Sequence, residues 1–483
     1  MRNARAAAVV YLTLLVVVGG LLAHQRASAA SIRTAAAGAP ICRYGVNATG
    51  GSDVFTDHDL TQLRIGWYLN YEAQPSPNHP AGVRFVPIIR LTQVGVNGFS
   101  YTPNGPALLS AIAASPGAAW LIGNEPDRPG PSQDDVEPHV YAAAYHELYG
   151  LIKAADPTAR IFAGTIVQPT PVRLMYLDLV LTSYHQTFGQ AMPVDGWSIH
   201  NFILNEVSCA HNPDCWGAEV PPGVDAPHGE IISIDQSDDF NLFTERIVRF
   251  RNWMKQRGYG DRPLYVTEYG ILMPPDYGFD ANRVNLFMTR SFDYMTSATD
   301  PNLGYAADGY RLVQEWSWYS TNDDYFNGWL FDTATRQLSA MGQNFANYTG
   351  GIAITNDLHP WRLATNPASP FTQGGPVAVQ LRATIANSGN PAVPAGPAVV
   401  RFYQGDPAQG GTQIGGDQVV NLAGCGALAV AGVTWNSAPA GMHRIFVVVD
   451  PAGSLAESDE TNNTREFPLL IATQQTFIPR VAR

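Results

Sequence analysis

The sequence has little charge, few cysteines and, after residue 23, no apolar run long enough to cross a membrane. Charged residues make up 14% of the 483 positions and hydrophobic residues 45%, a composition that favours a folded core over a disordered chain. Acidic residues outnumber basic ones by 41 to 29, and the formal net charge is −12. This balance argues against nucleic acid and anionic membranes as partners and leaves neutral polymers open.

The N-terminus has the form of a secretory signal peptide. Arg2 and Arg5 precede an apolar run over residues 6–23, and small residues at 27–29 form a cleavage site. We expect a signal peptide over residues 1–29, a secreted or cell-surface protein, and no membrane insertion once the signal is removed. A retained anchor is the alternative, because the run is long for a signal and could barely span a bilayer.

The four cysteines predict one disulfide. Cys209 and Cys215 enclose a tight polar loop, and an oxidising compartment favours a bond between them. A zinc site is the alternative, but the loop adds few convincing ligands. Cys42 and Cys425 fall in different predicted domains, so we expect them to be unpaired. We expect no metal and no cofactor.

Residues 41–350 alternate short apolar runs with helical patterns, which predicts βα units and a parallel sheet. Helices are expected at 139–155, 240–257, 282–296 and 337–348, and none in the proline-rich stretch 71–83. The eight expected strands are 43–47, 63–70, 84–91, 119–123, 160–166, 194–201, 264–268 and 311–318. This pattern predicts an α/β fold, a (β/α)8 TIM barrel with one degenerate helix.

The residue pattern of the sequence changes after residue 350. Residues 366–375 are expected to form a linker, and residues 376–471 alternate short strands with turn clusters and lack lysine. This is typical of a small all-β Ig-like sandwich. Its expected strands are 377–386, 398–404, 418–422, 428–435, 443–449 and 464–470. The tail, residues 472–483, has no assignable role.

Two expected strands end in glutamates. The fourth opens into Asn124-Glu125-Pro126, and proline cannot continue a central strand. The seventh ends at Glu268. A carboxylate at the mouth of an apolar strand costs free energy unless it is used or paired. Because strand-end residues of a barrel meet at one rim, the sequence predicts two facing carboxylates there.

These residues resemble the clan A glycoside hydrolases over residues 41–350. The resemblance implies a retaining hydrolase that cleaves O-glycosidic bonds of a polysaccharide or oligosaccharide, with Glu125 as acid/base and Glu268 as nucleophile. It also implies that Asn124 donates its amide to the sugar 2-hydroxyl. His200 ends the sixth strand, where the clan often has a histidine, and we expect it to position substrate together with Asn124, Trp316 and Arg90. Retention requires the two carboxyl groups to lie about 5–5.5 Å apart.

Other strand ends supply further candidates. Trp316 or Trp318 on strand eight could form the floor of a sugar subsite, with core packing as the alternative for Trp316. Arg90 closes strand three and could hold a carboxylate in its charged state. Relatives often carry a tyrosine two residues after the strand-six histidine, where this chain has Phe202, so we expect Tyr269 or another tyrosine to replace it.

The C-terminal region carries a second resemblance. Residues 448–451 lead to an acidic turn over residues 457–463 that ends in two asparagines, and this resembles the CARDB-type domain, an Ig-like module of bacterial surface proteins. The resemblance implies a binding or spacer role and a possible association with the cell surface. The acidic turn could bind calcium, and a hydrogen-bonded turn is the alternative.

Two other functions remain open. The barrel could bind glycans at the cell surface without catalysis, while the C-terminal domain supplies adhesion. Alternatively, the chain could be a structural surface protein with no sugar site. The alternative for Glu125 and Glu268 themselves is a salt bridge with Arg90 at the barrel mouth.

Overall fold

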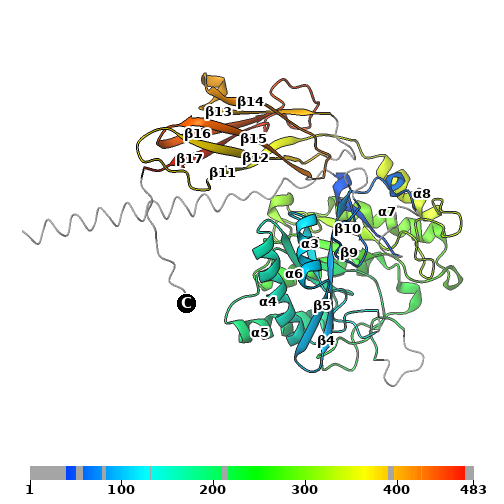
Figure 1. The fold of residues 1–483 in the computed structure, drawn as a ribbon. Coiled ribbons are helices and arrows are strands. Elements are labelled where there is room, and N and C mark those ends of the chain that lie inside the picture. Colours follow the sequence, from blue (N-terminus) through cyan, green and yellow to red (C-terminus); the bar gives the residue numbers. More distant parts are fainter. Residues whose placement is uncertain are drawn as a thin grey trace, which may run out of the picture. The chain divides into compact units, whose positions relative to one another are not determined.

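The structure is a computed structural model that describes residues 40–49, 58–78, 83–130, 132–208, 216–389, 396–425 and 427–473. The region before residue 351 contains helices and strands, and the region after it contains strands and one short 3-10 helix (Figure 1). The predicted signal peptide, the predicted bond between Cys209 and Cys215, and residues 474–483 of the tail lie outside the described residues. Within the described residues, no helix combines the length and apolarity that a bilayer span requires.

A curled sheet forms the centre of the α/β region. Its strand order is β3-β2-β1-β10-β9-β8-β7-β6-β4-β5, and neighbouring strands are parallel except for the antiparallel β4–β5 hairpin. The prediction of an α/β fold on a parallel sheet is confirmed. The strands are β1 (Tyr44–Asn47), β2 (Trp67–Leu69), β3 (Arg84–Phe85), β4 (Ile88–Val94), β5 (Gly98–Thr102), β6 (Ala119–Ile122), β7 (Arg160–Ile166), β8 (Gly196–His200), β9 (Leu264–Tyr269) and β10 (Glu315–Trp318).

One stretch of chain, residues 84–94, pairs with a strand near each end of this sheet. β3 pairs with β2, and β4 pairs with β6. Between them, Val86 donates its N–H to Tyr68 O at 2.9 Å, and Pro87 O accepts the N–H of Leu121 at 3.0 Å. The single strand expected at 84–91 is therefore interrupted, because Pro87 has no N–H to donate.

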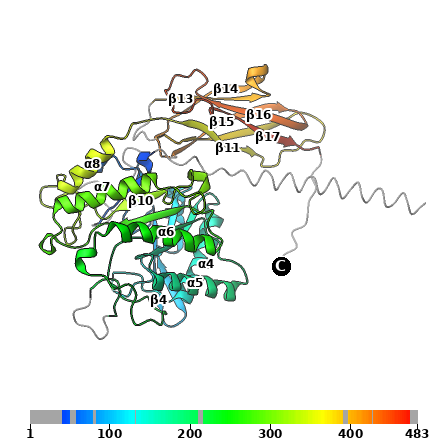
Figure 2. The same cartoon turned by 180° about the vertical axis from the view of Figure 1, so that it is seen from behind.

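Six α-helices occur in the described residues, and they pack on the outer face of the sheet (Figures 1 and 2). The expected helices at 139–155, 240–257 and 282–296 are confirmed to within two residues. The last begins later than expected, and the helices at 105–114 and 171–188 were not predicted. The helices are α3 (Gly105–Ala114), α4 (Pro138–Ala155), α5 (Pro171–Phe188), α6 (Phe240–Gln256), α7 (Ala281–Ser297) and α8 (Ala340–Gly350).

The sheet has an apolar core on each face. On the helix side, Trp197 of β8 packs edge to face on Trp253 of α6, with ring centroids 4.9 Å apart. On the inner side, a smaller cluster includes Trp67 and Phe162. Glycines make room for these two rings, since a Cβ at Gly196 would lie 2.3 Å from the Phe162 ring. The interior is therefore filled by side chains below the strand ends.

The C-terminal region is a pair of antiparallel sheets, β11-β12-β15 and β14-β13-β16-β17, that share one apolar core. The predicted all-β class is confirmed. The expected strand at 418–422 instead begins at residue 412, and β11 was not predicted. The strands are β11 (Leu358–Asn366), β12 (Val377–Asn387), β13 (Ala398–Gln404), β14 (Thr412–Val420), β15 (Ala427–Ala438), β16 (Gly441–Val449) and β17 (Thr464–Ile471).

The expected linker at 366–375 has a different place in the fold. β11 and β12 pair along their length, so the residues between them join two strands of one sheet. Their prolines and glycines form a connection within the sandwich, and the first sandwich strand begins at Leu358.

The acidic turn before β17 is hydrogen-bonded. Glu457 accepts the side-chain N–H of Asn463 at 3.0 Å and the backbone N–H of Leu358. Asp459 accepts the N–H of Thr461 at 2.9 Å. These carboxylates are already engaged by donors of the chain, which favours the hydrogen-bonded turn over a calcium site.

Cys42 and Cys425 form a disulfide, so the prediction that both are unpaired is wrong. Cys42 lies in the first 3-10 turn (Pro40–Arg43), and Cys425 follows β14. They are 383 positions apart in sequence. Sequence spacing gives no sign of such a bond, because only the folded chain brings the two residues together.

Candidate active site

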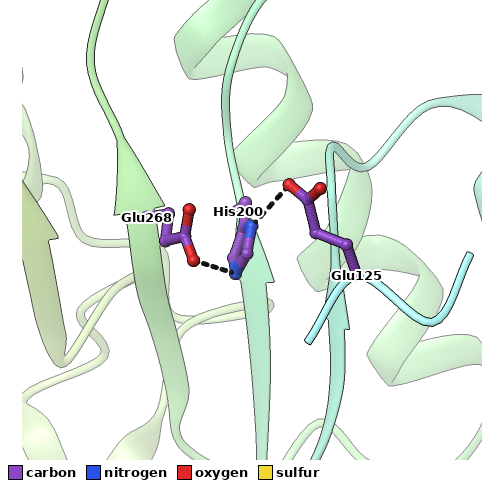
Figure 3. A group of neighbouring side chains, drawn as sticks. All are labelled: Glu125, His200 and Glu268. Atoms are coloured by element: carbon purple, nitrogen blue, oxygen red, sulfur yellow. Dashed lines mark hydrogen bonds and ion pairs between the residues drawn. The ribbon is translucent and has the colours of Figure 1, made fainter. Parts of the chain in front are cut away.

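Two glutamates and a histidine meet at the carboxyl ends of β6, β8 and β9 (Figure 3). His200 Nδ1 lies 2.9 Å from Glu125 Oε1, and His200 Nε2 lies 3.3 Å from Glu268 Oε1. One carboxylate oxygen from each glutamate and a ring nitrogen all lie within 4.8 Å of one another. The exposed fractions of the three residues are 2% for Glu125, 1% for His200 and 5% for Glu268. The two predicted catalytic glutamates are therefore neighbours.

Backbone pairing sets this geometry. His200 pairs with Glu268 in the β8–β9 register, next to an irregularity that follows Ile199. Glu125 lies beyond the end of β6, and its N–H donates to Thr165 O of β7 at 3.0 Å. Glu125 has a φ of 44°, in the left-handed region. A glutamate held in this conformation indicates a locally strained turn, a feature common at functional sites.

Glu125 has a cationic partner as well as the histidine. Arg128 Nη1 lies 3.1 Å from Glu125 Oε2, and its other terminal nitrogen donates to Gly217 O. Burial alone would raise the pKa of Glu125, but Arg128 and His200 outweigh it and lower that pKa to about 2. Glu125 is therefore ionised at neutral pH in this geometry.

Glu268 has the opposite electrostatics. Burial is the largest cause and raises the pKa of Glu268 to about 7, and the charge of Glu125 adds to this effect. His200, Tyr71 and Arg90 oppose it. Burial lowers the pKa of His200, but Glu268 and Glu125 outweigh burial and raise it. Near neutral pH these effects favour the protonated form of His200 and leave Glu268 partly protonated.

Arg90 and Asn124 are joined through Asp134. Arg90 Nε donates to Asp134 Oδ1 at 2.6 Å, and Asp134 Oδ2 accepts the N–H groups of Leu91 and Asn124, each at 2.8 Å. Arg90 thus pairs with Asp134, and its effect on Glu268 is through charge. The alternative of a salt bridge from Arg90 to the two glutamates does not describe the site, because Arg128 is the arginine paired with Glu125.

The Asn124 side chain is only partly engaged. Its Nδ2 donates to Gln133 Oε1 at 3.1 Å. Its Oδ1 is buried and has no hydrogen-bond partner. An amide in this condition, one residue before Glu125, retains hydrogen-bonding capacity for a ligand.

Trp316 does not face the site. It is fully buried and packs edge to face on Tyr44, with ring centroids 4.7 Å apart, in the core between sheet and helices. Trp318 lies in the same core and donates its ring N–H to Gly328 O. The two tryptophans share a face, as strand alternation predicts, but it is the face covered by helices. The subsite role predicted for Trp316 is therefore wrong.

A small apolar cluster lies at the same strand ends. Phe202 packs edge to face on Tyr319, with centroids 5.8 Å apart, and is also near the His200 ring. Leu272 and Met273, which follow β9, contact this cluster. Tyr269 points the other way, into the core beside Phe243, so it does not replace the tyrosine expected at Phe202.

Sequence reasoning missed three residues beside the glutamates. Arg128 follows Glu125 by three positions, Tyr319 directly follows β10, and Tyr71 follows the end of β2 by two. Tyr71 and Tyr319 lie just past a strand end, and Arg128 lies in the loop that carries Glu125, so these positions were the available signal. The pKa of Tyr71 and that of Tyr319 are both raised, mainly by burial and also by the charges of Glu268 and Glu125.

A buried ion-pair network supports the loop that carries Glu125. Arg173 of α5 lies 2.6 Å from Asp127 Oδ2 through Nη1 and 2.7 Å from Glu206 Oε1 through Nε. All three side chains are fully buried. Val167 also donates its N–H to Asp127 at 3.2 Å. These contacts fix the backbone two residues after Glu125.

The same three site residues form a set that could ligate a metal ion. Two carboxylates and an imidazole within 4.8 Å of one another are donors that transition metals accept. However, Arg128 already neutralises Glu125, and Arg90 adds positive charge near Glu268. These cations oppose a further cation, so the donor set fits acid–base chemistry better than metal binding.

Comparison with known proteins identifies one domain. Residues 355–467 match the CARDB family model, and this range begins just before β11. The comparison with curated proteins finds no match.

Among solved structures, the chain is similar to glycoside hydrolases and CARDB domains. A GH128 (subgroup II) endo-β-1,3-glucanase from Sorangium cellulosum has 16% identity and a TM-score of 0.38, covering 63% of this chain and 98% of the other. A glucosidase from Croceicoccus marinus has 12% identity and a TM-score of 0.42, covering 83% and 94%. A CARDB domain from Pyrococcus furiosus, solved with di-metal ions, has 21% identity and a TM-score of 0.20, covering 25% and 98%.

Proposed function

We propose that this protein is a retaining glycoside hydrolase with Glu125 as acid/base and Glu268 as nucleophile. The observation that carries the proposal is the approach of the two carboxylates, which have oxygens within 4.8 Å of each other at the carboxyl ends of β6 and β9. Retaining enzymes separate these groups by about 5–5.5 Å, whereas inverting enzymes need about 6.5–9.5 Å to admit a water.

We also propose that the α/β region is a closed (β/α)8 barrel. The stretch 84–94 pairs with β2 through β3 and with β6 through β4, so it can serve as one interrupted barrel strand. This arrangement supports a cup-shaped site at the carboxyl ends of the strands, where barrel enzymes hold their catalytic residues.

In the proposed reaction, Glu268 attacks the anomeric carbon while Glu125 protonates the departing oxygen, and the glycosyl–Glu268 ester forms. Glu125 then removes a proton from water, which hydrolyses the ester and frees Glu268. Asn124 Nδ2 has a second N–H beyond the one that it donates to Gln133, which supports its predicted role as a donor to the sugar 2-hydroxyl. His200 contacts both glutamates and Arg90 anchors Asp134, so these residues position the pair.

The acid role of Glu125 requires a proton that this geometry stores elsewhere. Arg128 and His200 keep Glu125 ionised, while His200 Nδ1 lies on a direct 2.9 Å path to Glu125 Oε1. A substrate that displaces Arg128 from Glu125 would make the ionised form of Glu125 less stable. A proton could then pass from His200 to Glu125 and on to the leaving oxygen.

Azide rescue on 2,4-dinitrophenyl glycosides tests the reaction and the two roles together. We screen a panel of α- and β-linked sugars with the wild type, Glu125→Ala and Glu268→Ala. We expect azide to restore Glu125→Ala with a glycosyl azide of retained configuration, since azide replaces water in the second step. It should restore Glu268→Ala with inverted configuration. Exchanged stereochemistry would mean that the two glutamates have the opposite roles.

Non-catalytic glycan binding is the second candidate function, and one observation favours it. The ion pair of Arg128 with Glu125 leaves the proposed acid without a proton. Affinity electrophoresis in soluble polysaccharides, run on the wild type and Glu268→Gln, separates the two functions. Binding by both variants, with no hydrolysis of any aryl glycoside by the wild type, would establish the binding protein.

We further propose that the protein is exported. The disulfide between Cys42 and Cys425 is of a kind that persists in oxidising compartments, and the N-terminal residues have the composition of a signal peptide. The CARDB domain would then act outside the cell as a spacer or binding module. N-terminal sequencing of the protein recovered from culture medium tests export, and recovery only from the cytoplasm would contradict it.

A further inference from the structure

Tyr71 brings a buried hydroxyl to the proposed catalytic pair. It lies two residues after β2, and its ring packs against the inner cluster of the sheet that includes Trp67 and Phe162. Its hydroxyl oxygen is buried and has no hydrogen-bond partner in the described structure. A buried hydroxyl without a partner is unfavourable, so this position needs an explanation.

Glu268 also has a buried oxygen without a full hydrogen-bond partner. Its Oε1 is also buried without a satisfied hydrogen bond, although His200 Nε2 lies 3.3 Å away. The Tyr71 hydroxyl is close enough to act on Glu268 as a hydrogen-bond donor, and in that capacity it lowers the pKa of the carboxyl. A buried donor and a buried acceptor that both lack a full partner thus belong to the same site.

The backbone at Tyr71 is also unusual. Its φ is 65°, in the left-handed region that residues other than glycine rarely adopt. The fold therefore accepts local strain where the Tyr71 side chain enters the site. Left-handed backbone at a residue beside functional groups is a feature common at functional sites, and Tyr71 shares it with Glu125.

Two nearby tyrosines have other partners. Tyr319 donates its hydroxyl to Asp323 at 2.5 Å. Tyr269 is turned into the helix-facing core, where its hydroxyl accepts a hydrogen bond from Ser291 at 3.4 Å. Tyr71 is thus the one of these three whose hydroxyl remains available to Glu268.

We propose that Tyr71 is a positioning residue for Glu268: its hydroxyl donates to the carboxylate, fixes the orientation of the attacking oxygen and stabilises the negative charge that returns when the glycosyl ester is hydrolysed. The proposal rests on the proposed function, in which Glu268 is the nucleophile. No proton is transferred in this role, because Tyr71 donates a hydrogen bond and remains neutral throughout.

The test is Tyr71→Phe, which keeps the ring and removes the hydroxyl. The substrate is the 2,4-dinitrophenyl glycoside that the wild type hydrolyses fastest, because its activated leaving group makes the first step depend little on Glu125. We expect kcat/KM to fall about 10-fold or more. We also expect the acidic limb of its pH profile to move up by about one pH unit, since a hydrogen bond to a charged group is of that strength.

The matched control is Tyr68→Phe. Tyr68 lies in β2, three residues earlier, and donates its buried hydroxyl to Asn78 O at 2.9 Å. It loses the same atom without touching either glutamate, so it should leave the acidic limb in place. An unchanged limb in Tyr71→Phe, or an equal shift in both variants, would overturn the proposal.

A second variant covers the case in which Tyr71→Phe folds poorly. Incorporating 3-fluorotyrosine at position 71 keeps the shape and makes the hydroxyl a stronger donor, so the acidic limb should move to lower pH. A limb that stays in place would overturn the proposal. Azide rescue of Glu268→Ala separates this failure from failure of the proposed function: rescue with unshifted profiles overturns the role of Tyr71 alone, whereas no rescue and no wild-type hydrolysis overturn both.

Discussion

The α/β region and the CARDB sandwich differ in how deeply their charged side chains are buried. In the α/β region, Asp127, Arg173 and Glu206 are fully buried around the loop that carries Glu125. The sandwich has an apolar shared core, and pairs such as Arg444 with Glu466 lie at its surface. Because burying charge costs several kcal/mol per ion before pairing, the concentration of such groups in the α/β region agrees with the active site that we propose there.

The largest expected effect is on catalysis. Glu125→Gln should lower kcat/KM on an unactivated oligosaccharide by about 10²–10⁴-fold, the usual contribution of a general acid–base group. Arg444→Ala in the sandwich, which removes an exposed ion pair, should leave the same rate unchanged. Initial rates of both variants on the substrate class found by the glycoside panel provide the measurement. Equal losses in the two variants would remove the functional contrast between the regions.

The buried network should dominate stability. Arg173→Met leaves Asp127 and Glu206 as buried charges without their partner, which should reduce the free energy of unfolding by about 3–5 kcal/mol. Urea unfolding of the wild type and the variant at pH 7 measures the difference. The matched control is again Arg444→Ala, whose exposed pair should contribute little. A neutral effect of Arg173→Met would mean that the network is not needed to hold the Glu125 loop.

A smaller effect should appear in the pH dependence of stability. The pKa of Glu268 is raised to about 7 from an unfolded value of about 4.3. A raised pKa means that the folded state prefers the protonated form, so stability is fully present below pH 4.3 and declines as pH rises toward 7. Glu268→Gln cannot ionise and should be more stable than the wild type at pH 8 by up to about 3 kcal/mol. This gain in stability should be smaller at pH 4.

Thermal unfolding of the two proteins between pH 4 and pH 8 provides this comparison. Asp417→Asn is the control, because its carboxylate lies on the sandwich surface and pairs with Arg401. An advantage of Glu268→Gln that does not grow with pH would contradict the electrostatics described for the site.

The smallest expected effect is that of metal removal. Arg128 and Arg90 place positive charge around the two glutamates, so prolonged dialysis against EDTA should leave hydrolysis within about twofold of its starting rate. Activity that disappears on dialysis and returns with one divalent metal would show instead that Glu125, His200 and Glu268 are ligands.

The sequence predicted well where local patterns carry the information. Apolar periodicity located α4, α6 and α7, because each buries one face against the sheet. It missed α5, where Arg173 is buried while Met175 and Leu179 are substantially exposed. In α5 a buried ion-pair network takes the place of part of the apolar face, so apolar periodicity does not predict the helix.

The sequence by itself determined that two glutamates end two apolar strands, since strand length and the proline after Glu125 are local properties. Only the tertiary structure decided which groups surround them. His200 ends β8 and Tyr71 follows β2, so both come to the glutamates from distant parts of the chain, and the pairing of Cys42 with Cys425 spans most of the chain. Distances between residues remote in sequence follow from how the strands pack, and these distances set the protonation of the site.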